Sequence, residues 1–329
     1  MIENRTVLSA SRIKLFSSCS WCYYSKYVLK LNDKGNEGTF RGTIVHLVLE
    51  CLLNKRHKKH FDLITSKNDV FSSTALTRLV LKHAKKTKVD DEENLALINE
   101  MILVALKCDF YCQGSESIIS EEKFELEFED YSVTGYIDKI AIYPNGTVGI
   151  FDYKTSKNKF TKDEIDGNLQ ALMYSLACYK IRKIIPAVNF LFLRFPRSPK
   201  LQITQCSLEE LKGYENYLAY MTDYLSNFTL SKATCTYAFS LEKTKWLCGF
   251  AREKDQLTKN GKKMFCCSYK FPFNYYSLVD KKTGEPIAAS EDPKQLEEKE
   301  GTKIIYRKFH GCPAWGYKIT KKFQDLPKI

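Results

Sequence analysis

Two aspartates and a lysine in the middle of the chain have the residue types and spacing that metal-ion chemistry requires. Asp138 and Asp152 lie on two apolar segments that a short turn connects, and Lys154 follows two residues after Asp152. Two facing carboxylates repel each other, and a divalent cation such as Mg²⁺ or Mn²⁺ relieves that repulsion by binding their oxygens. A lysine beside such a cation can polarise water or stabilise charge that develops at phosphorus.

The turn between the two segments decides whether the aspartates face each other. Tyr143-Pro144-Asn145-Gly146 suits a type I turn, because its proline presets φ at the second position and its glycine accepts a left-handed conformation. That turn pairs Tyr143 with Thr147, so opposed residue numbers sum to about 290. Asp138 then lies opposite Asp152, with Lys154 on the same face. A two-residue Asn-Gly loop would turn Asp152 to the other face, and the proline favours the first register.

The surroundings of Asp152 bear on its role. Exposed carboxylates at a strand edge, with Lys154 as a simple charge partner, are the structural alternative to a metal site. Asp152 is embedded in Gly149-Ile150-Phe151-Asp152-Tyr153-Lys154, an apolar strand in which a solvated acid is unexpected. This context favours the metal site.

Periodicity predicts the elements that must position these side chains. Helices are expected over residues 9–31 and about 41–55, and a weakly patterned helical segment over 56–120. Strands are expected over 123–129, 131–143, 148–154 and 187–195. A helix opens at Thr161, where Thr161 and Glu164 match a capping box, and another covers 207–228. The predicted fold is α/β, a mixed central sheet flanked by helices in the order α-β-β-β-α-β across residues 40–195.

The domain organisation follows from this pattern. Residues 1–229 are expected to form one domain with a helical N-terminal part and a helical insertion around 56–120. Residues 230–329 read as an irregular, basic, cysteine-containing extension that packs on this core. No internal repeat or long flexible linker separates the two.

Four short motifs together resemble the PD-(D/E)xK nucleases, in particular their RecB/AddB-like branch, over roughly residues 8–195. In chain order the motifs are His46 within Gly42-Thr43-Ile44-Val45-His46, then Gly135-Tyr136-Ile137-Asp138, then Asp152-Tyr153-Lys154, then Gln170 with Tyr174. The opening Leu8-Ser9-Ala10-Ser11-Arg12-Ile13, followed by Cys19, is similar to the start of the same nuclease domains. The resemblance implies a restriction-endonuclease-like core and includes phage-type recombination exonucleases.

The resemblance also implies roles for individual residues. Asp138 and Asp152 would be the main metal ligands, completed by His46 and the carbonyl of Tyr153. Lys154 would be catalytic, and Gln170 and Tyr174 would face the active site and position the DNA strand. For His46 a satisfied core histidine is the alternative, although His46, Glu50 and Asn54 form a polar stripe on an apolar helix.

The segment after the lysine suits phosphate contacts. Its polar and basic residues are Thr155, Ser156, Lys157 and Lys159, and such side chains commonly bind DNA phosphates. A solvated basic turn is the alternative for this segment.

The twelve cysteines are too sparse for a disulfide scaffold, so reduced thiols are expected. The resemblance implies a [4Fe–4S] cluster held by Cys19 and three C-terminal cysteines, with Cys248, Cys266 and Cys267 as candidates. Cys22, Cys235 and Cys312 are further candidates, and zinc is a second possible metal. Seventeen residues separate Cys248 from Cys266, and this departure from the close-set family pattern favours buried reduced thiols over a cluster.

Composition limits the classes of function. A hydrophobic content of 44% excludes global disorder, and no apolar stretch is long enough to span a membrane. No secretory signal is apparent near the start, so a cytoplasmic location is expected, or the host-cell cytoplasm for a viral protein. The excess of 51 Lys and Arg over 39 acids favours a polyanionic partner. Residues 301–329, with seven basic residues and interleaved aromatic ones, suit single-stranded DNA, and a partly packed terminus with a solvated basic face is the alternative.

The expected function is that of a metal-dependent deoxyribonuclease, an exonuclease that processes DNA ends in recombination, repair or replication. The alternatives are a non-catalytic DNA-binding or assembly subunit with a nuclease fold, and an endonuclease for structured DNA or RNA. No Gly-x-x-x-x-Gly-Lys-Ser/Thr motif occurs, so ATP hydrolysis is not expected of this chain. By family analogy, a helicase or strand-annealing protein is the expected partner.

Overall fold

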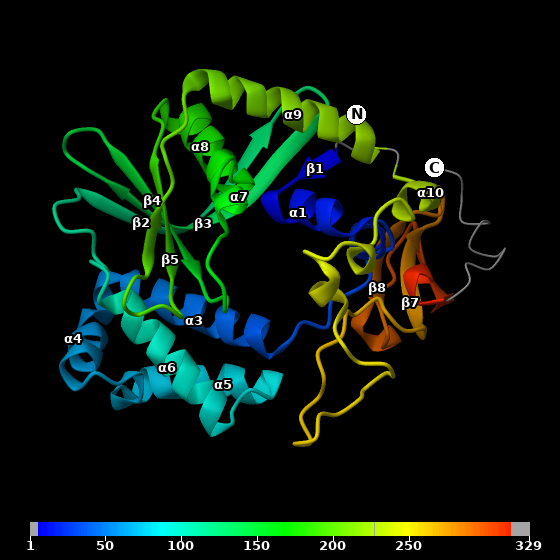
Figure 1. The fold of residues 1–329 in the computed structure, drawn as a ribbon, viewed down its shortest axis with the longest axis horizontal. Helices are drawn as coiled ribbons and strands as arrows, with labels where there is room; N and C mark the ends of the chain where they lie inside the picture. Colours follow the sequence, from blue (N-terminus) through cyan, green and yellow to red (C-terminus); the bar gives the residue numbers. More distant parts are fainter. Residues whose placement is uncertain (1–5, 227, 317–329) are drawn as a thin grey trace. The chain divides into compact units, whose positions relative to one another are not determined.

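The chain forms two compact units in a computed structural model that describes residues 6–226 and 228–316 (Figure 1). The first unit consists of Met1–Ala10 and Asn36–Tyr220, and the second of Ser11–Gly35 and Met221–Ile329. The sequence-based division placed the boundary near 230 and assigned residues 11–35 to the first domain. The structure instead joins that segment to the C-terminal residues.

The first unit is built on a six-stranded mixed sheet. Its strands are β1 (Thr6–Leu8), β2 (Ser117–Glu127), β3 (Tyr131–Ile142), β4 (Val148–Lys154), β5 (Ala187–Phe192) and β6 (Lys200–Gln202). The order is β1-β3-β4-β5-β6, and β2 pairs with β3. β4 is antiparallel to β3 and parallel to β5, so the predicted mixed sheet is confirmed.

Helices cover both faces of this sheet (Figure 1). One side carries α3 (Glu37–Leu53), α4 (Lys58–Lys67), α5 (Thr74–Thr87) and α6 (Glu92–Leu106), and the other carries α7 (Lys162–Ile165) and α8 (Leu169–Arg182). α9 (Leu208–Ser226) follows β6. The predicted α-β-β-β-α-β order is confirmed. It corresponds to α3, then β2, β3 and β4, then α8 and β5.

The main core of the first unit lies between the sheet and the α3–α6 layer. It gathers Val48, Leu49 and Leu52 of α3 with Ile98 and Ile102 of α6, all essentially inaccessible to solvent. Because these side chains recur at helical spacing on α3 and α6, they form one apolar face on each helix. This packing holds α3, which carries His46, against the strands.

Local signals in the sequence explain where elements begin and turn. The Thr161–Glu164 capping box is present at the start of α7, and the Asn36 side chain accepts a hydrogen bond from the Thr39 amide at the start of α3. In the β3–β4 turn, Gly146 has φ +79° and Lys139 pairs with Phe151, which confirms the predicted register.

The second unit combines short helices with a small antiparallel sheet. Its helices are α1 (Ala10–Ser18), which starts at the unit boundary, α2 (Ser20–Tyr23), a π-helical turn (Tyr24–Val28) and α10 (Leu230–Ala233). β7 (Phe273–Asp280) lies between β8 (Pro286–Ser290) and β9 (Thr302–Phe309). This sheet differs from the irregular extension predicted after residue 230, because the buried positions of β7 run together rather than alternating strictly. The basic residues from 317 onward lie outside the described residues.

None of the helices within residues 6–226 and 228–316 is both long and apolar enough to cross a membrane.

Candidate active site

The candidate site forms where β3 and β4 separate. On one edge of β3, β1 pairs with residues 131–133 and β4 with residues 139–142, so Asp138 comes directly before the stretch that pairs with β4. The Tyr153 amide donates a hydrogen bond to Asp138 Oδ2 at 2.7 Å. Because β3 and β4 separate here, the Tyr153 amide hydrogen-bonds to the Asp138 carboxylate and not to a backbone carbonyl of β3.

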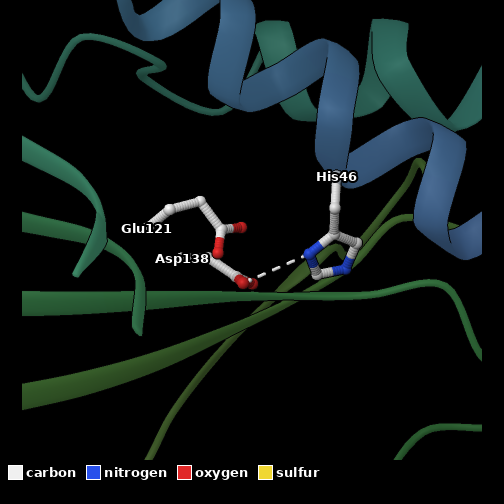
Figure 2. Close-up of side chains that lie close together, drawn as sticks. All are labelled: His46, Glu121 and Asp138. Atoms are coloured by element: carbon white, nitrogen blue, oxygen red, sulfur yellow. Dashed lines mark hydrogen bonds and ion pairs between the residues drawn. The ribbon is translucent and has the colours of Figure 1, made fainter. Parts of the chain in front are cut away.

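His46 and Glu121 converge on Asp138 from two other elements. Figure 2 shows the three side chains pointing toward one another, from α3, β2 and β3 respectively. One ligand atom from each lies within 4.8 Å of the other two. His46 Nδ1 lies 3.1 Å from Asp138 Oδ1, and His46 Nε2 lies 3.0 Å from the Tyr153 carbonyl oxygen. Three of the four predicted metal-binding positions, His46, Asp138 and Tyr153, are therefore brought together.

Glu121 was not predicted from the sequence. The strand expected over 123–129 begins at Ser117 in the structure, so the register of this segment was not considered. Ser120 pairs with Lys139 and Glu122 with Ile137, which places Glu121 directly across from Asp138. Its backbone φ of +49° marks a local irregularity at this point of β2.

Asp152 lies in an adjoining group of side chains. Its Oδ1 accepts hydrogen bonds from Gln170 Nε2 and the Tyr174 hydroxyl, each at 2.8 Å. Its Oδ2 lies 2.7 Å from Lys154 Nζ, which also donates to Gln170 Oε1 at 2.6 Å. The predicted residues Asp152, Lys154, Gln170 and Tyr174 thus form one connected group through these contacts. Asp152 is not a member of the three-residue group of His46, Glu121 and Asp138.

The electrostatics of the site reflect crowded carboxylates in a buried place. Burial raises the pKa of Asp152, although the Lys154 ammonium opposes this shift, and the Asp138 charge raises it further. Burial and then the Asp138 charge raise the pKa of Glu121. Burial lowers the pKa of His46, but its hydrogen bond to Asp138 and the nearby carboxylates outweigh burial and raise it. The site therefore holds more negative charge than its own cations neutralise.

Two motif glycines are required by close approach. A Cβ on Gly42 would lie 2.8 Å from Thr155 Oγ1, so α3 passes directly over the end of β4. A Cβ on Gly135 would lie 2.5 Å from the Phe124 ring, and that ring packs edge-on against Tyr174. Gly42 thus lets α3 approach the end of β4, and Gly135 leaves room on β3 for the Phe124 ring of β2.

The predicted phosphate-contacting segment divides into two parts. Ser156 and Lys157 are exposed. Thr155 packs against Gly42, and Lys159 Nζ donates to the carbonyl and to the hydroxyl of Ser198, the latter at 2.9 Å. In the structure Thr155 therefore lies against α3, and Lys159 links its loop to Ser198.

Residues that could hold a divalent cation are present. Oxygen donors with one imidazole suit Mg²⁺ or Mn²⁺, and His46, Glu121, Asp138 and the Tyr153 carbonyl provide this donor set. Asp152 Oδ2 is buried and accepts no hydrogen bond of good geometry, although Lys154 Nζ is near. An unsatisfied buried carboxylate oxygen beside clustered acids fits a bound cation.

A second cluster of metal-binding side chain types lies within the second unit. Cys19, Cys22, Cys248, Cys267 and Cys312 line one small cavity, together with Trp21, Lys270 and Trp315. The sulfur atoms of Cys22 and Cys267 lie 3.6 Å apart. A hydrogen bond from Cys22, opposed by burial and aided by backbone amides, lowers the pKa of Cys19 to about 6. A thiolate is therefore favoured at Cys19 near neutral pH.

The cavity changes the set of candidate ligands. Cys266 does not line it, and its sulfur is directed to the Cys267 carbonyl oxygen at 3.3 Å. Cys312, a further candidate from the sequence, lines the cavity, whereas Cys235 is exposed. The spacing in sequence did not indicate this because Cys312 is brought in by the last strand of the small sheet, β9.

Comparisons with known proteins agree with the motifs. A protein from Carboxydothermus hydrogenoformans, named as a subunit of an ATP-dependent helicase/deoxyribonuclease, is 29% identical over 246 residues, which cover 64% of this chain and 22% of that protein. A Streptococcus pyogenes protein with the same name is 26% identical over 157 residues, which cover 46% of this chain and 14% of that protein. The chain thus spans less than a quarter of the length of these relatives.

Among solved structures, a putative exonuclease from Eubacterium rectale matches with a TM-score of 0.45 and 11% identity, covering 77% of this chain and 91% of that one. The sequence pattern of the PD-(D/E)XK nuclease superfamily matches residues 7–249, well over half of the chain. With its mixed sheet and the four motifs gathered at one site, this chain belongs to the PD-(D/E)XK nuclease superfamily.

Proposed function

We propose that the chain is a Mg²⁺- or Mn²⁺-dependent deoxyribonuclease that acts as an exonuclease on DNA ends. The observation that carries this proposal is the convergence of His46, Glu121 and Asp138 beside the Asp152–Lys154 pair. A non-catalytic subunit would have no need to keep all of these groups together in a buried, electrostatically costly arrangement.

Different side chains of the site have different roles in phosphodiester hydrolysis. A cation held by His46, Glu121, Asp138 and the Tyr153 carbonyl, with the buried Oδ2 of Asp152 beside them, would supply Lewis-acid charge at the scissile phosphate. Lys154 Nζ donates to Gln170 and contacts Asp152, so its remaining hydrogen is available to the attacking water or a phosphate oxygen. Gln170 fixes Asp152 and Lys154 simultaneously. The Tyr174 hydroxyl, which can donate to Asp152 or to the Tyr136 carbonyl, anchors this group to β3.

The exposed side chains of Ser156 and Lys157 follow the catalytic lysine, and we assign them to DNA phosphate contacts. The relatives named as subunits of a helicase/deoxyribonuclease support a helicase as the partner of this chain, and a strand-annealing protein is the second partner class. Action at DNA ends in recombination or repair is consistent with a cytoplasmic location.

The assay that tests the function uses end-labelled linear DNA and covalently closed circular DNA of the same sequence. With Mg²⁺ or Mn²⁺, the linear DNA is expected to be degraded from its ends and the circular DNA to survive, because an exonuclease needs an end. EDTA is expected to stop the reaction. Cleavage of the closed circle would establish the endonuclease alternative. Tight DNA binding without cleavage under any metal would establish the non-catalytic one.

We further propose that the cysteine cavity holds a [4Fe–4S] cluster through Cys19, Cys248, Cys267 and Cys312, with Cys22 beside it. Four of the five thiols that line the cavity come from segments far apart in sequence, which supports a bound centre over chance packing. Zinc, the other metal considered for these thiols, is an outcome of the same test.

Adjacent cysteines offer a matched test of this assignment. Cys267→Ala is expected to lose cluster iron, sulfide and absorption near ~400 nm in anaerobically purified protein, because it removes a ligand. Cys266→Ala is expected to retain all three, since Cys266 does not line the cavity and its sulfur is hydrogen-bonded to the Cys267 carbonyl oxygen. Equal loss in both variants would contradict the ligand set. Wild-type protein containing zinc, or neither metal, would exclude the cluster.

A further inference from the structure

Lys270 is a lysine buried among the cysteines of the second unit. Its side chain is 1% exposed, and it lines the cavity formed by Cys19, Cys22, Cys248, Cys267 and Cys312. Its ammonium donates to the carbonyl oxygens of Gly249 at 3.2 Å and Ala251 at 2.6 Å. It also lies 3.4 Å from the centre of the Trp315 ring, another residue of the cavity wall.

A buried lysine normally has an acidic partner. Removing an ammonium ion from water costs several kcal/mol unless an opposite charge compensates it. Within residues 6–226 and 228–316, no carboxylate forms an ion pair with Lys270. The Gly249 and Ala251 carbonyls and the Trp315 ring solvate the ammonium. None of these groups carries a negative charge that would neutralise it.

Five thiols that can become negative line the same cavity as Lys270. Cys312 is connected to it directly, because the Cys312 amide donates to the Lys270 carbonyl oxygen at 3.0 Å. Cys267 precedes it by three residues, and the Cys267 amide donates to the carbonyl of Cys248 at 3.2 Å. Three of the proposed ligands are therefore fixed through backbone contacts in the same small region as the ammonium.

A thiolate-bound centre would supply the missing negative charge. Four thiolates carry more negative charge than a [4Fe–4S] core neutralises, and reduction adds one further negative charge. We propose that Lys270 is the buried counter-cation of the centre in this cavity, a positioning residue that stabilises the bound cluster and favours its reduced form. This inference rests on the proposed cluster and adds the residue that sets its electrostatic environment.

The direction of the effect follows from charge. Cluster potentials depend on net charge, hydrogen bonds to sulfur and burial. A fixed positive charge in a site of low dielectric constant stabilises the more negative, reduced state more than the oxidised state. Removing the charge should therefore make the midpoint potential more negative, whereas exchanging one cation for another should not.

The experiment compares Lys270→Met with Lys270→Arg and with wild-type protein, each purified anaerobically as the full chain. Iron and sulfide content is measured first, and the midpoint potential is then measured by a redox titration followed by electron paramagnetic resonance. In Lys270→Met the equilibrium constant for reduction is expected to fall at least tenfold, a shift of about 59 mV for a one-electron couple. Lys270→Arg is expected to stay near wild type. If Lys270→Met does not fold, Lys270→Gln removes the charge while keeping a hydrogen-bond donor.

The outcomes separate this inference from the proposals on which it rests. A full cluster with an unchanged potential in Lys270→Met or Lys270→Gln would overturn the role of Lys270 and leave the cluster intact. A wild-type protein without iron and sulfide would overturn the cluster and this inference together. Neither result would bear on nuclease activity, which the DNA assays measure separately. A purely structural lysine would lower the stability of both uncharged variants without moving the potential.

Discussion

Asp138→Asn is expected to abolish DNA cleavage while leaving the fold and DNA binding largely intact. Asparagine keeps an oxygen that can accept the hydrogen bond from the Tyr153 amide, so the gap between β3 and β4 can retain its geometry. The substitution removes the charge that the cation requires. A loss of about 4 kcal/mol of transition-state stabilisation corresponds to roughly a thousandfold fall in kcat. Single-turnover cleavage of end-labelled DNA over a range of Mg²⁺ concentrations measures this effect.

Two adjacent glutamates provide the matched control for this prediction. Glu121 faces Asp138 and His46, whereas Glu122 forms an ion pair with Arg182 at 2.8 Å. Glu121→Gln should therefore raise the Mg²⁺ concentration that gives half-maximal cleavage, and Glu122→Gln should leave it unchanged. Wild-type cleavage by Asp138→Asn, or equal effects of the two glutamine variants, would show that the metal lies elsewhere.

Lys154→Met is expected to damage both catalysis and the stability of the metal-free protein. Loss of one charged donor at the reacting phosphate typically costs about 10²–10³ in rate. In EDTA, the variant also leaves Asp152, whose side chain is 5% exposed, without its counter-ion. Removing one partner of a buried ion pair costs about 3–5 kcal/mol. We expect the lower end, because Lys154 is partly exposed and Gln170 and Tyr174 still hold Asp152.

A double variant separates the two effects of Lys154. Adding Asp152→Asn to Lys154→Met removes the uncompensated charge, so stability in urea unfolding should recover while activity stays lost. Lys157→Met is the control, since Lys157 is exposed and should contribute little to stability. If Lys154→Met unfolds in EDTA at the wild-type urea concentration, Lys154 does not compensate a buried carboxylate, and its assigned position is wrong.

The main features of the nuclease fold were predictable because their causes are local. Pro144 and Gly146 specify a turn of one length, and that length sets the β3–β4 register, as the Lys139–Phe151 pair confirms. The capping box at Thr161 likewise depends on residues three apart. Alternating and helical periodicities place most of the strands and helices within a few residues of their observed bounds.

Glu121 could not be assigned a place at the site from its neighbours in sequence. Its position depends on the pairing of β2 with β3, two strands whose register no short turn motif in the sequence identified. The same limitation applies to the surroundings of Lys159. Its bond to Ser198 joins two loops 39 residues apart, and no local signal specifies that contact.

By itself, the sequence determined the class of fold, the register of the carboxylate hairpin and the residue types available for metal chemistry, because turns, caps and periodicity act over a few residues. Only the tertiary structure decided that Glu121 joins His46 and Asp138, and that Asp152 lies with Lys154, Gln170 and Tyr174. It also decided that Cys312 rather than Cys266 lines the cysteine cavity beside the buried Lys270. These groupings arise from the packing of distant segments against one another, which the spacing of residues along a chain does not encode.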